Sequence, residues 1–277
     1  MIPKRTPGRY NCGMDLELKG KRAIVTGGSR GIGKAVARAL ADEGCDVVVA
    51  ARTLDALEDC AVELASTGRR IVPIVVDTAS QDSVELMVMA AAEAIGGVDI
   101  LVNSAAKPMG QSRPPKLAEI TEEMFWDDVN VKVLGYLRCA QAVAPRMAAA
   151  GWGRIINISG LGARSTGSAI GSMRNVAVAA LTKNLADELG PKGINVTVVH
   201  PGLTRTEATP GVVARLAEAQ GISAEEAERS MTRNTIGHMV DASEVAAVVA
   251  FLASPRSIAI NGDAIACGGG VPGSIYY

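Results

Sequence analysis

One stretch of the sequence decides the fold: Thr26-Gly27-Gly28-Ser29-Arg30-Gly31-Ile32-Gly33. It lies between a short β-branched run, residues 22–26, and an alanine-rich segment, residues 32–43, which predict a strand and a helix joined by a tight turn. Glycines in such a turn let backbone N–H groups and the helix N-terminus approach a diphosphate closely. A further apolar run at residues 46–51 supplies the next strand, so the order of elements predicts a dinucleotide-binding βαβ unit.

Short apolar runs alternate with longer alanine-rich segments along the whole chain. Seven such runs span residues 22–26, 46–51, 71–76, 99–103, 154–159, 194–199 and 263–267. They lack a regular alternation of apolar and polar residues, which is typical of strands covered by helices on both faces of a parallel sheet. The pattern therefore predicts a doubly wound α/β fold of the Rossmann type, with a seven-stranded parallel sheet in a single domain.

The length of 277 residues, 48% of them hydrophobic, suffices for one large core. We expect this domain to span residues 17–277, after a flexible arm at residues 1–16. Helices are expected between the strands, at residues 32–43, 54–65, 81–95, 122–149 and 172–189. The charged segment at about 206–240 follows a strand and predicts a helical insertion over the carboxyl edge of the sheet. We interpret it as a mobile lid; the alternative is a surface insertion that only packs.

Charge and composition narrow the class of ligand. Lys and Arg total 28 against 29 Asp and Glu, and the net charge of -1 offers no long-range attraction for nucleic acid or an anionic membrane. No apolar run approaches the ~20 residues that a bilayer requires, so no membrane segment is expected. The five cysteines lack metal-ligand spacing, which predicts reduced thiols in a cytoplasmic protein and no metal site. A small-molecule ligand is therefore expected.

The glycine turn and its context resemble the short-chain dehydrogenase/reductase family, whose members carry T-G-x-x-x-G-x-G at this place. The likeness covers residues 16 to about 271. It continues in Asp77-Thr78, Asn103-Ser104-Ala105-Ala106, Asn130, Pro201-Gly202-Leu203-Thr204-Arg205-Thr206 and Asn261-Gly262. The resemblance implies a set of cofactor-binding residues, namely Gly27, Ser29, Arg30, Gly31, Ile32, Gly33, Arg52, Asp77, Thr78, Asn103, Ser104, Ala105, Asn175, Pro201, Gly202, Thr204 and Thr206.

The end of the second predicted strand bears on which nicotinamide cofactor is bound. A site for NAD(H) needs an acid there to accept hydrogen bonds from the ribose 2'-hydroxyl, whereas this chain has Ala51 and then Arg52. Arg52 and Arg30 are candidates to clamp a 2'-phosphate from two sides with charge-assisted hydrogen bonds. The sequence thus favours NADP(H) over NAD(H); the alternative is that both arginines are simply solvated.

The catalytic positions of the family follow the fifth strand. The resemblance implies a serine that polarises the substrate carbonyl, a tyrosine and a lysine in a Y-x-x-x-K motif, and an asparagine on the preceding helix. The first three positions fall on Gly160, Gly171 and Asn175, while Asn130 matches the asparagine or is a structural residue near a helix bend. Glycine has no proton to transfer and Asn175 carries no positive charge, so the usual proton transfer is not expected.

Other polar residues of this region are candidates to complete the reaction. The predicted catalytic residues are Asn130, Asn175 and Ser172. Further candidates are Ser159, Ser165, Ser168, Arg164, Arg174 and the C-terminal pair Tyr276-Tyr277. The serines are alternatively helix caps or loop hydrogen-bonding residues. A last group is expected to be structural: Lys132, Tyr136 and Lys183 on solvated helix faces, and His200 and His238 in core or surface positions.

Three functions remain open on these grounds. The first is an NADP(H)-dependent oxidoreductase that acts on a small carbonyl, imine, enone or alcohol through a non-standard proton-transfer arrangement. The second is a catalytically inactive NADP(H)-binding protein with a regulatory or partner role, because a fold does not guarantee chemistry. A hydratase or isomerase that uses the same pocket is a third alternative. The family resemblance also implies a homotetramer or homodimer.

Overall fold

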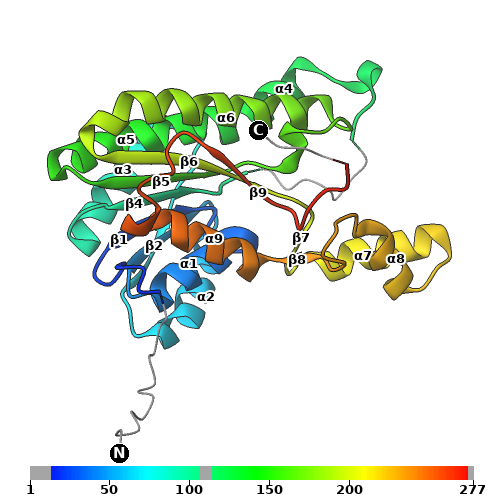
Figure 1. The fold of residues 1–277 in the computed structure, drawn as a ribbon, viewed down its shortest axis with the longest axis horizontal. Coiled ribbons are helices and arrows are strands. Elements are labelled where there is room, and N and C mark those ends of the chain that lie inside the picture. The colour runs from blue at the N-terminus through cyan, green and yellow to red at the C-terminus, as the bar shows by residue number, and fades with distance from the viewer. Residues whose placement is uncertain (1–13, 107–113, 274–277) are drawn as a thin grey trace, which may run out of the picture.

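The central feature of the computed structural model is a parallel sheet of seven strands (Figure 1). The structure describes residues 14–106 and 114–273. The strands of this sheet are β1 (Arg22–Thr26), β2 (Asp46–Ala51), β3 (Ile71–Val75), β4 (Ile100–Asn103), β5 (Gly153–Ile158), β6 (Ile194–Pro201) and β9 (Ala264–Cys267). Their order is β3-β2-β1-β4-β5-β6-β9, so the direction of winding reverses between β1 and β4. The predicted doubly wound Rossmann fold in one domain is confirmed, and ligands bind at this reversal in such folds.

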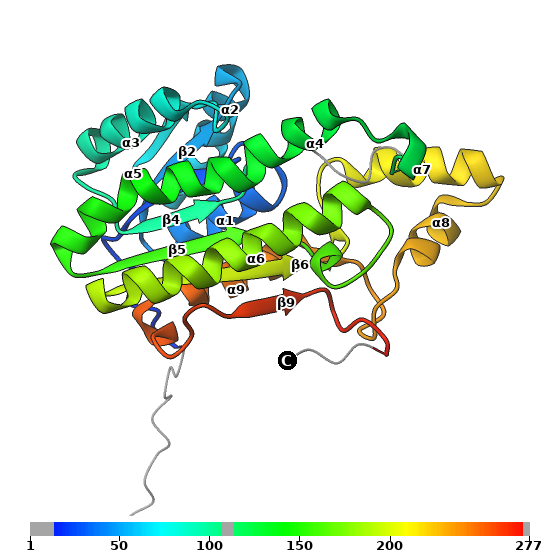
Figure 2. The same ribbon diagram turned by 90° about the horizontal axis from the view of Figure 1, so that it is seen from above.

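Helices cover both faces of the sheet, as the uniformly apolar strands require (Figures 1 and 2). One face carries α1 (Gly31–Asp42), α2 (Leu54–Leu64) and α9 (Ala242–Ala253), whose buried side chains form one hydrophobic core with the strands. The opposite face carries α3 (Gln81–Ile95), α5 (Gly135–Ala150) and α6 (Ala169–Leu189), which form the second core. Short 3-10 turns follow or connect these elements at Ala65–Thr67, Leu117–Glu119, Leu161–Ala163, Gly190–Lys192 and Pro255–Ser257.

The long helix predicted at residues 122–149 is not continuous. It consists of α4 (Glu122–Val129), a π-helical turn at Asn130–Leu134 and α5. A π turn adds one residue per hydrogen-bonded loop, shifts the helical phase and is frequent at functional sites. Gly135 then lies so close to the end of β3 that a Cβ built on it would lie 2.9 Å from Cβ of Thr78. Because of this shift, a single 3.6-residue period does not predict which side chains of the segment face the sheet.

The predicted helical insertion projects beyond the carboxyl edge of the sheet as a separate lobe (Figures 1 and 2). It contains α7 (Thr209–Gln220) and α8 (Ala224–Met231). At its base, β7 (Thr204–Arg205) pairs with β8 (Val240–Asp241) in a small parallel sheet. The Arg205 guanidinium contacts the carboxylates of Glu228 on α8 and Asp241 at the base, so ion pairs join the lobe to the body.

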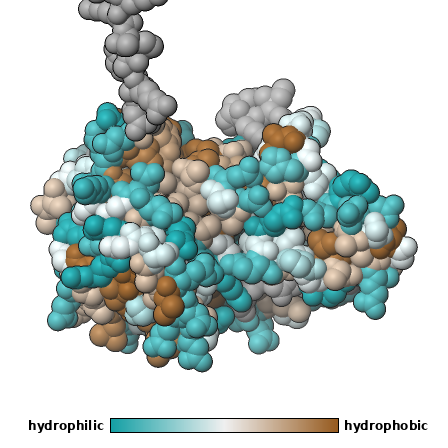
Figure 3. Space-filling model, turned by 90° about the horizontal axis from the view of Figure 1, so that it is seen from below, coloured by the Kyte–Doolittle hydropathy of each residue, from teal (hydrophilic) through white to brown (hydrophobic). Residues whose placement is uncertain are grey.

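The surface seen from below carries hydrophilic residues over most of its area, with the α7–α8 lobe at one side (Figure 3). Hydrophobic residues appear there as separate patches and not as one continuous area. None of the helices in the described residues has the length and hydropathy to cross a bilayer. Most of the buried hydrophobic residues in the described part of the chain belong to the two cores between the sheet and its helices.

Candidate functional site

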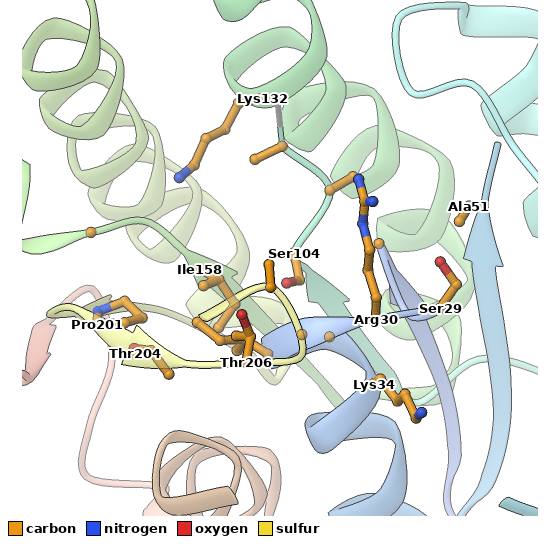
Figure 4. Close-up of a pocket in the computed structure, with 18 of the residues that line it drawn as sticks. Ser29, Arg30, Lys34, Ala51, Ser104, Lys132, Ile158, Pro201, Thr204 and Thr206 are labelled. Carbon is orange, nitrogen blue, oxygen red and sulfur yellow. The ribbon is translucent and has the colours of Figure 1, made fainter. Parts of the chain in front are cut away.

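A cavity of about 1070 Å³ opens at the carboxyl ends of β1, β2, β4, β5 and β6 (Figure 4). Its walls are the glycine turn after β1, the loops after the other strands, and α7 and α8 of the lobe. Of the predicted cofactor-binding residues, all but Asn103 line this cavity. Asn103 is fully buried beneath it, where its Nδ2 donates to Oδ1 of Asn157 at 2.9 Å. The structure thus brings the predicted set together in one place, with Asn103 as a supporting residue in the floor.

The glycine turn forms one end of the cavity. Glycine is required at two of its positions because a side chain would collide with neighbouring backbone. Gly27 has a φ of +67°, and a Cβ built on it would lie 2.8 Å from the backbone nitrogen of Ala105. A Cβ on Gly33 would lie 2.2 Å from the carbonyl oxygen of Gly27. The Gly31 N–H, at the start of α1, faces the cavity and donates to the Glu207 carboxylate. This bare backbone at a helix N-terminus has the geometry of an anion-binding turn.

Two arginines stand at the β2 side of this turn. Arg30 and Arg52 are exposed and line the cavity. Figure 4 shows Arg30 on the side of the cavity where Ala51 ends β2. Neither guanidinium has an ion-pair or hydrogen-bond partner within the described part of the chain. Lys34, one helical turn along α1, also lines the cavity but pairs with Glu63 at 2.5 Å. The two exposed guanidinium groups bring positive charge to this corner, while the carboxylates of Asp77 and Glu207 also line the cavity.

Lys132 lies at the opposite end of the cavity, and its predicted place on a solvated helix face is wrong. It lies in the π turn, and only 4% of it is exposed. Figure 4 shows its side chain extending from the helix into the cavity. Its Nζ donates to the carbonyl oxygen of Ser159 at 3.0 Å and to Oδ1 of Asn175 at 3.2 Å. The π turn rotates this side chain inward, and α6 and β5 then bury it.

Asn175 sits on α6 at the position that the family resemblance assigns to lysine. It is 6% exposed and lines the cavity. Its Oδ1 accepts from Lys132, and its backbone oxygen accepts from the Ser159 hydroxyl at 3.1 Å. A Cβ built on Gly160 would lie 3.2 Å from Asn175 Nδ2, so the amide NH₂ lies beside that glycine. Lys132, Ser159 and Asn175 therefore form one polar cluster at the end of β5, which we call the Lys132 cluster.

The electrostatic surroundings of Lys132 favour its neutral form. Burial is the main cause that lowers its pKa from 10.5 to about 7, and the nearby Arg174 guanidinium lowers it further, whereas Asp128 raises it. The Asp128 carboxylate is itself paired with Arg174 at 2.5 Å, both side chains being buried. His200, at the end of β6, is 1% exposed, and burial followed by the charges of Arg164 and Lys132 lowers its pKa to about 4. His200 is therefore neutral near pH 7 and accepts from the Gly160 N–H at 3.4 Å.

Several other predicted candidates lie away from the cavity. Asn130 points elsewhere, its Oδ1 accepting from Arg138 at 2.9 Å. Ser172 donates to the carbonyl oxygen of Ser165 at 2.9 Å, and neither Ser172 nor Asn130 lines the cavity. Asn175 is thus the one of the three predicted catalytic residues that the structure brings to the cavity. Ser168 caps α6, which begins three residues earlier than predicted, by accepting from the Gly171 N–H at 3.1 Å.

The remaining assignments divide between structural roles and segments outside the described residues. Arg164 donates to the carbonyl oxygen of Ala264 at 3.3 Å. Tyr136 is buried, contrary to the prediction, and its hydroxyl donates to the Ile158 carbonyl at 2.9 Å. Lys183 is confirmed as solvated, with 60% of its side chain exposed. Tyr276-Tyr277 and most of the predicted N-terminal arm lie outside the described residues.

A family model described as short chain dehydrogenase matches residues 21–216. This chain belongs to the short-chain dehydrogenase family. It is 36% identical over 253 residues to a putative ketoacyl reductase of Streptomyces coelicolor, which covers 89% of this chain and 95% of that one. It is 35% identical to the short-chain reductase protein NovJ of Streptomyces niveus, over 90% of this chain and 93% of that one.

Solved structures agree with this family membership. The L-sorbose reductase of Gluconobacter frateurii, complexed with NADPH and L-sorbose, superposes on this short-chain dehydrogenase with a TM-score of 0.89. The two chains are 29% identical, and the match covers 95% of this chain and 100% of the other. The family is one of oxidoreductases, and the fold and the place of the cavity are those that the sequence resemblance implied.

Sequence reasoning missed two residues of the cavity in this short-chain dehydrogenase. Lys132 was assigned to solvent, although a lone lysine among Val131, Val133 and Leu134 is a recognisable departure from an apolar helix face. Glu207 follows the Pro-Gly loop directly and was not considered. No local sequence signal shows that its carboxylate reaches Gly31, which is 176 positions away along the chain. Both assignments depend on contacts between distant segments.

Proposed function

We propose that this short-chain dehydrogenase is an NADP(H)-dependent oxidoreductase that interconverts a small carbonyl, imine or enone compound and its reduced form. The observation that carries the proposal is one continuous cavity with a diphosphate-binding turn at one end and the Lys132 cluster at the other. When bound, the cofactor supplies or accepts a hydride at its nicotinamide ring. The chain has to hold the acceptor carbon beside that ring and to manage one proton.

The residues present fit a dinucleotide. The backbone of Gly27 and Gly33 leaves no room for side chains, which is the cradle that a diphosphate needs at the start of α1. Asp77 and Thr78 line the cavity beyond β3 and are proposed to contact the adenine. Asn175, Pro201 and Thr204 line the far end and are proposed to hold the nicotinamide half.

The preference for NADP(H) over NAD(H) is proposed from the charges at the end of β2. Ala51 stands where an acid would bind the ribose 2'-hydroxyl, and the unpaired guanidinium groups of Arg30 and Arg52 flank the same corner. A phosphate at the 2' position would form charge-assisted hydrogen bonds with both arginines. A bare ribose would leave these two cations without a partner.

A non-standard arrangement of proton transfer is part of the proposal. Gly160, Gly171 and Asn175 stand at the positions that the resemblance assigns to the serine, tyrosine and lysine of the family. The names of relatives, a ketoacyl reductase and a sorbose reductase, support a carbonyl compound as substrate. Arg174, Val212 and Met231 line the cavity beyond the Lys132 cluster and give the substrate end one cation and an apolar wall.

The lobe at residues 206–240 is proposed as a mobile lid. Val212 on α7 and Met231 on α8 line the cavity, so movement of the lobe would change access to the substrate end. The ion pairs of Arg205 with Glu228 and Asp241 are the contacts that such a movement would strain. A hinge at the two-residue strands β7 and β8 would leave the main sheet undisturbed.

We also propose that the protein forms a homo-oligomer and is located in the cytoplasm. Met173 and Val176 are each 51% exposed on α6, a helix whose outer apolar face supports a homodimer or homotetramer. Sedimentation analysis tests this directly, and a monomer at micromolar concentration would contradict it.

The described cysteines are free thiols, three of them buried, which supports a cytoplasmic location.

One experiment tests the proposed activity. NADPH is titrated into the purified protein by nicotinamide fluorescence, and the complex is then mixed with activated ketones, imines and conjugated enones while reduced-nicotinamide absorbance is followed. We expect saturable binding and turnover with at least one acceptor class. The control is Gly27→Val, checked for folding by circular dichroism, which should lose both signals because of the 2.8 Å approach to Ala105. Tight binding without turnover in either direction would instead support the inactive cofactor-binding protein.

A further inference from the structure

The substrate end of the cavity needs a group that can release a proton near neutral pH. At this end the cavity is lined by the polar side chains of Lys132, Ser159, Arg174 and Asn175. The Arg174 guanidinium is held in a buried ion pair with Asp128, and an amide such as that of Asn175 does not titrate. The Ser159 hydroxyl already donates within the cluster and is a weak acid without a neighbouring base. Lys132 is the remaining group of this set, and its side chain extends into the substrate end of the cavity (Figure 4).

The hydrogen bonds of Lys132 leave part of its donor capacity unused. A lysine ammonium has three N–H donors, and Nζ directs two of them to Ser159 and Asn175. Both acceptors are neutral, and the Asp128 carboxylate, which raises the pKa of Lys132, is paired with Arg174. The ammonium is thus held in a fixed position without a counter-ion of its own. One N–H bond remains for a molecule in the cavity, into which the side chain extends (Figure 4).

We propose that Lys132 is the proton donor of this enzyme and protonates the substrate heteroatom as the substrate is reduced. The proposal rests on the proposed oxidoreductase function and names the group that replaces the missing tyrosine. In carbonyl reduction the carbon gains the hydride and the oxygen gains a proton from Nζ, so that a ketone becomes an alcohol and NADPH is oxidised to NADP⁺. The neutral amine then regains a proton from water. In the reverse direction the amine accepts the hydroxyl proton.

The charges that face Lys132 from every packed element suit this role. Its π turn packs against α4, which carries Asp128, against α5, and against α6, which carries Arg174. His200 on β6 is neutral near pH 7 and adds no charge there. Burial and Arg174 hold the pKa of Lys132 at about 7, so ammonium and amine coexist at neutral pH. A donor with a pKa near the working pH is the most effective general acid.

Asn175 is proposed as a positioning residue for this lysine. Its Oδ1 accepts one Nζ–H at 3.2 Å, and Ser159 ties its backbone to β5. The amino group that Asn175 lacks is thus supplied by Lys132 of the π turn, which lies directly beside it. Nothing in the proposal requires Gly160 or Gly171 to take part in the chemistry.

The first measurement reads the titration of Lys132 without any turnover. The full-length protein is pulse-labelled with trace acetic anhydride between pH 5.5 and 10, and lysine acetylation is quantified by mass spectrometry. We expect Lys132 to titrate near pH 7 and to be protected by NADP⁺. Lys183, which is exposed, is quantified in the same samples as the reference for a solvated lysine. A Lys132 that titrates like Lys183, or that resists labelling at every pH, would overturn the proposal.

The second measurement uses the acceptor that the wild type reduces fastest. Lys132→Met and Lys132→Arg should each lower kcat about 100-fold or more while NADPH affinity stays within about threefold. Lys183→Met is the matched control and should retain wild-type turnover. A small primary amine such as methylamine should partly restore turnover to Lys132→Ala. The arginine variant is decisive, because it keeps the charge but releases no proton.

The outcomes separate the two proposals. A wild type that turns over no acceptor contradicts the proposed function, whatever Lys132 does in the labelling. An active wild type whose Lys132→Arg variant remains active contradicts only the assignment of Lys132 as donor and reduces its role to charge. If Lys132→Met fails to fold, two results still test whether Lys132 is the proton donor. They are the labelling profile of the wild type and the turnover of Lys132→Arg.

Discussion

The carboxylate of Glu207 accepts a hydrogen bond from the Gly31 N–H, with Oε2 3.0 Å and Oε1 3.3 Å from the amide nitrogen. Glu207 follows β7, whereas Gly31 opens α1, and both residues line the cavity. The carboxylate thus occupies a donor that the proposed diphosphate would use. Cofactor binding would have to displace this negative charge.

Glu207→Gln is therefore expected to tighten NADPH binding. The amide removes repulsion between a carboxylate and the diphosphate at one helix N-terminus, which corresponds to an affinity gain of about 3- to 10-fold at low salt. Fluorescence titration of NADPH measures it, and the gain should shrink as ionic strength rises. Glu218→Gln, on the exposed side of α7, is the matched control. Unchanged affinity at low salt would show that Glu207 moves away at no cost.

Arg52→Asp is expected to reverse the cofactor preference. The exchange removes one of the two cations proposed for the 2'-phosphate. It also places a carboxylate next to the end of β2, where it could accept a hydrogen bond from the ribose 2'-hydroxyl. NADPH affinity should fall about tenfold or more, since a charge-assisted hydrogen bond is worth roughly 1.5–3 kcal/mol, while NADH affinity should hold or rise. Dissociation constants for both cofactors measure the change. Arg146→Asp, on the exposed face of α5, should alter neither, and equal losses for both cofactors would contradict the assignment.

Lys132 should also leave a mark on the pH dependence of stability. Its pKa is about 7 in the folded protein and 10.5 when the chain is unfolded, so between these values the unfolded state binds more protons. The free energy of unfolding should then rise with pH in this window, by at most about 1.4 kcal/mol per pH unit from this group. Denaturant unfolding of the wild type and Lys132→Met across the window gives the difference in slope. Equal slopes would show that Lys132 titrates normally.

Gly33→Ala is expected to destabilise the fold as well as the cofactor site. Its Cβ would lie 2.2 Å from the Gly27 carbonyl oxygen, which is backbone and cannot move aside cheaply. Such overpacking costs about 1–3 kcal/mol, which thermal or denaturant unfolding would detect. Gly211→Ala in α7 is the control, since its Cβ would meet only the flexible Arg215 side chain at 3.6 Å. A neutral Gly33→Ala would mean that the turn adopts another conformation.

The agreement between sequence and structure is closest where local chemistry decides. All seven strands lie within two residues of their predicted bounds, because uninterrupted β-branched runs suit only a sheet covered on both faces. The division of the predicted helix at residues 122–149 escaped sequence reasoning, because no residue type marks a π turn. The predictions that Lys132 and Tyr136 lie on solvated helix faces were also wrong, because both side chains are buried.

The glycine turn, the seven strands of the parallel sheet and the presence of Arg30 and Arg52 near the turn were predicted from the sequence alone. The turn and the two arginines lie in short segments of the chain, although the close approach of Ala105 to Gly27 comes from the pairing of β1 with β4. The burial of Lys132 against Asn175 and the reach of Glu207 to Gly31 were decided only by the tertiary structure. Those contacts join segments 43 and 176 positions apart, and the desolvation that changes the pKa of Lys132 exists only once α6 and β5 pack around it.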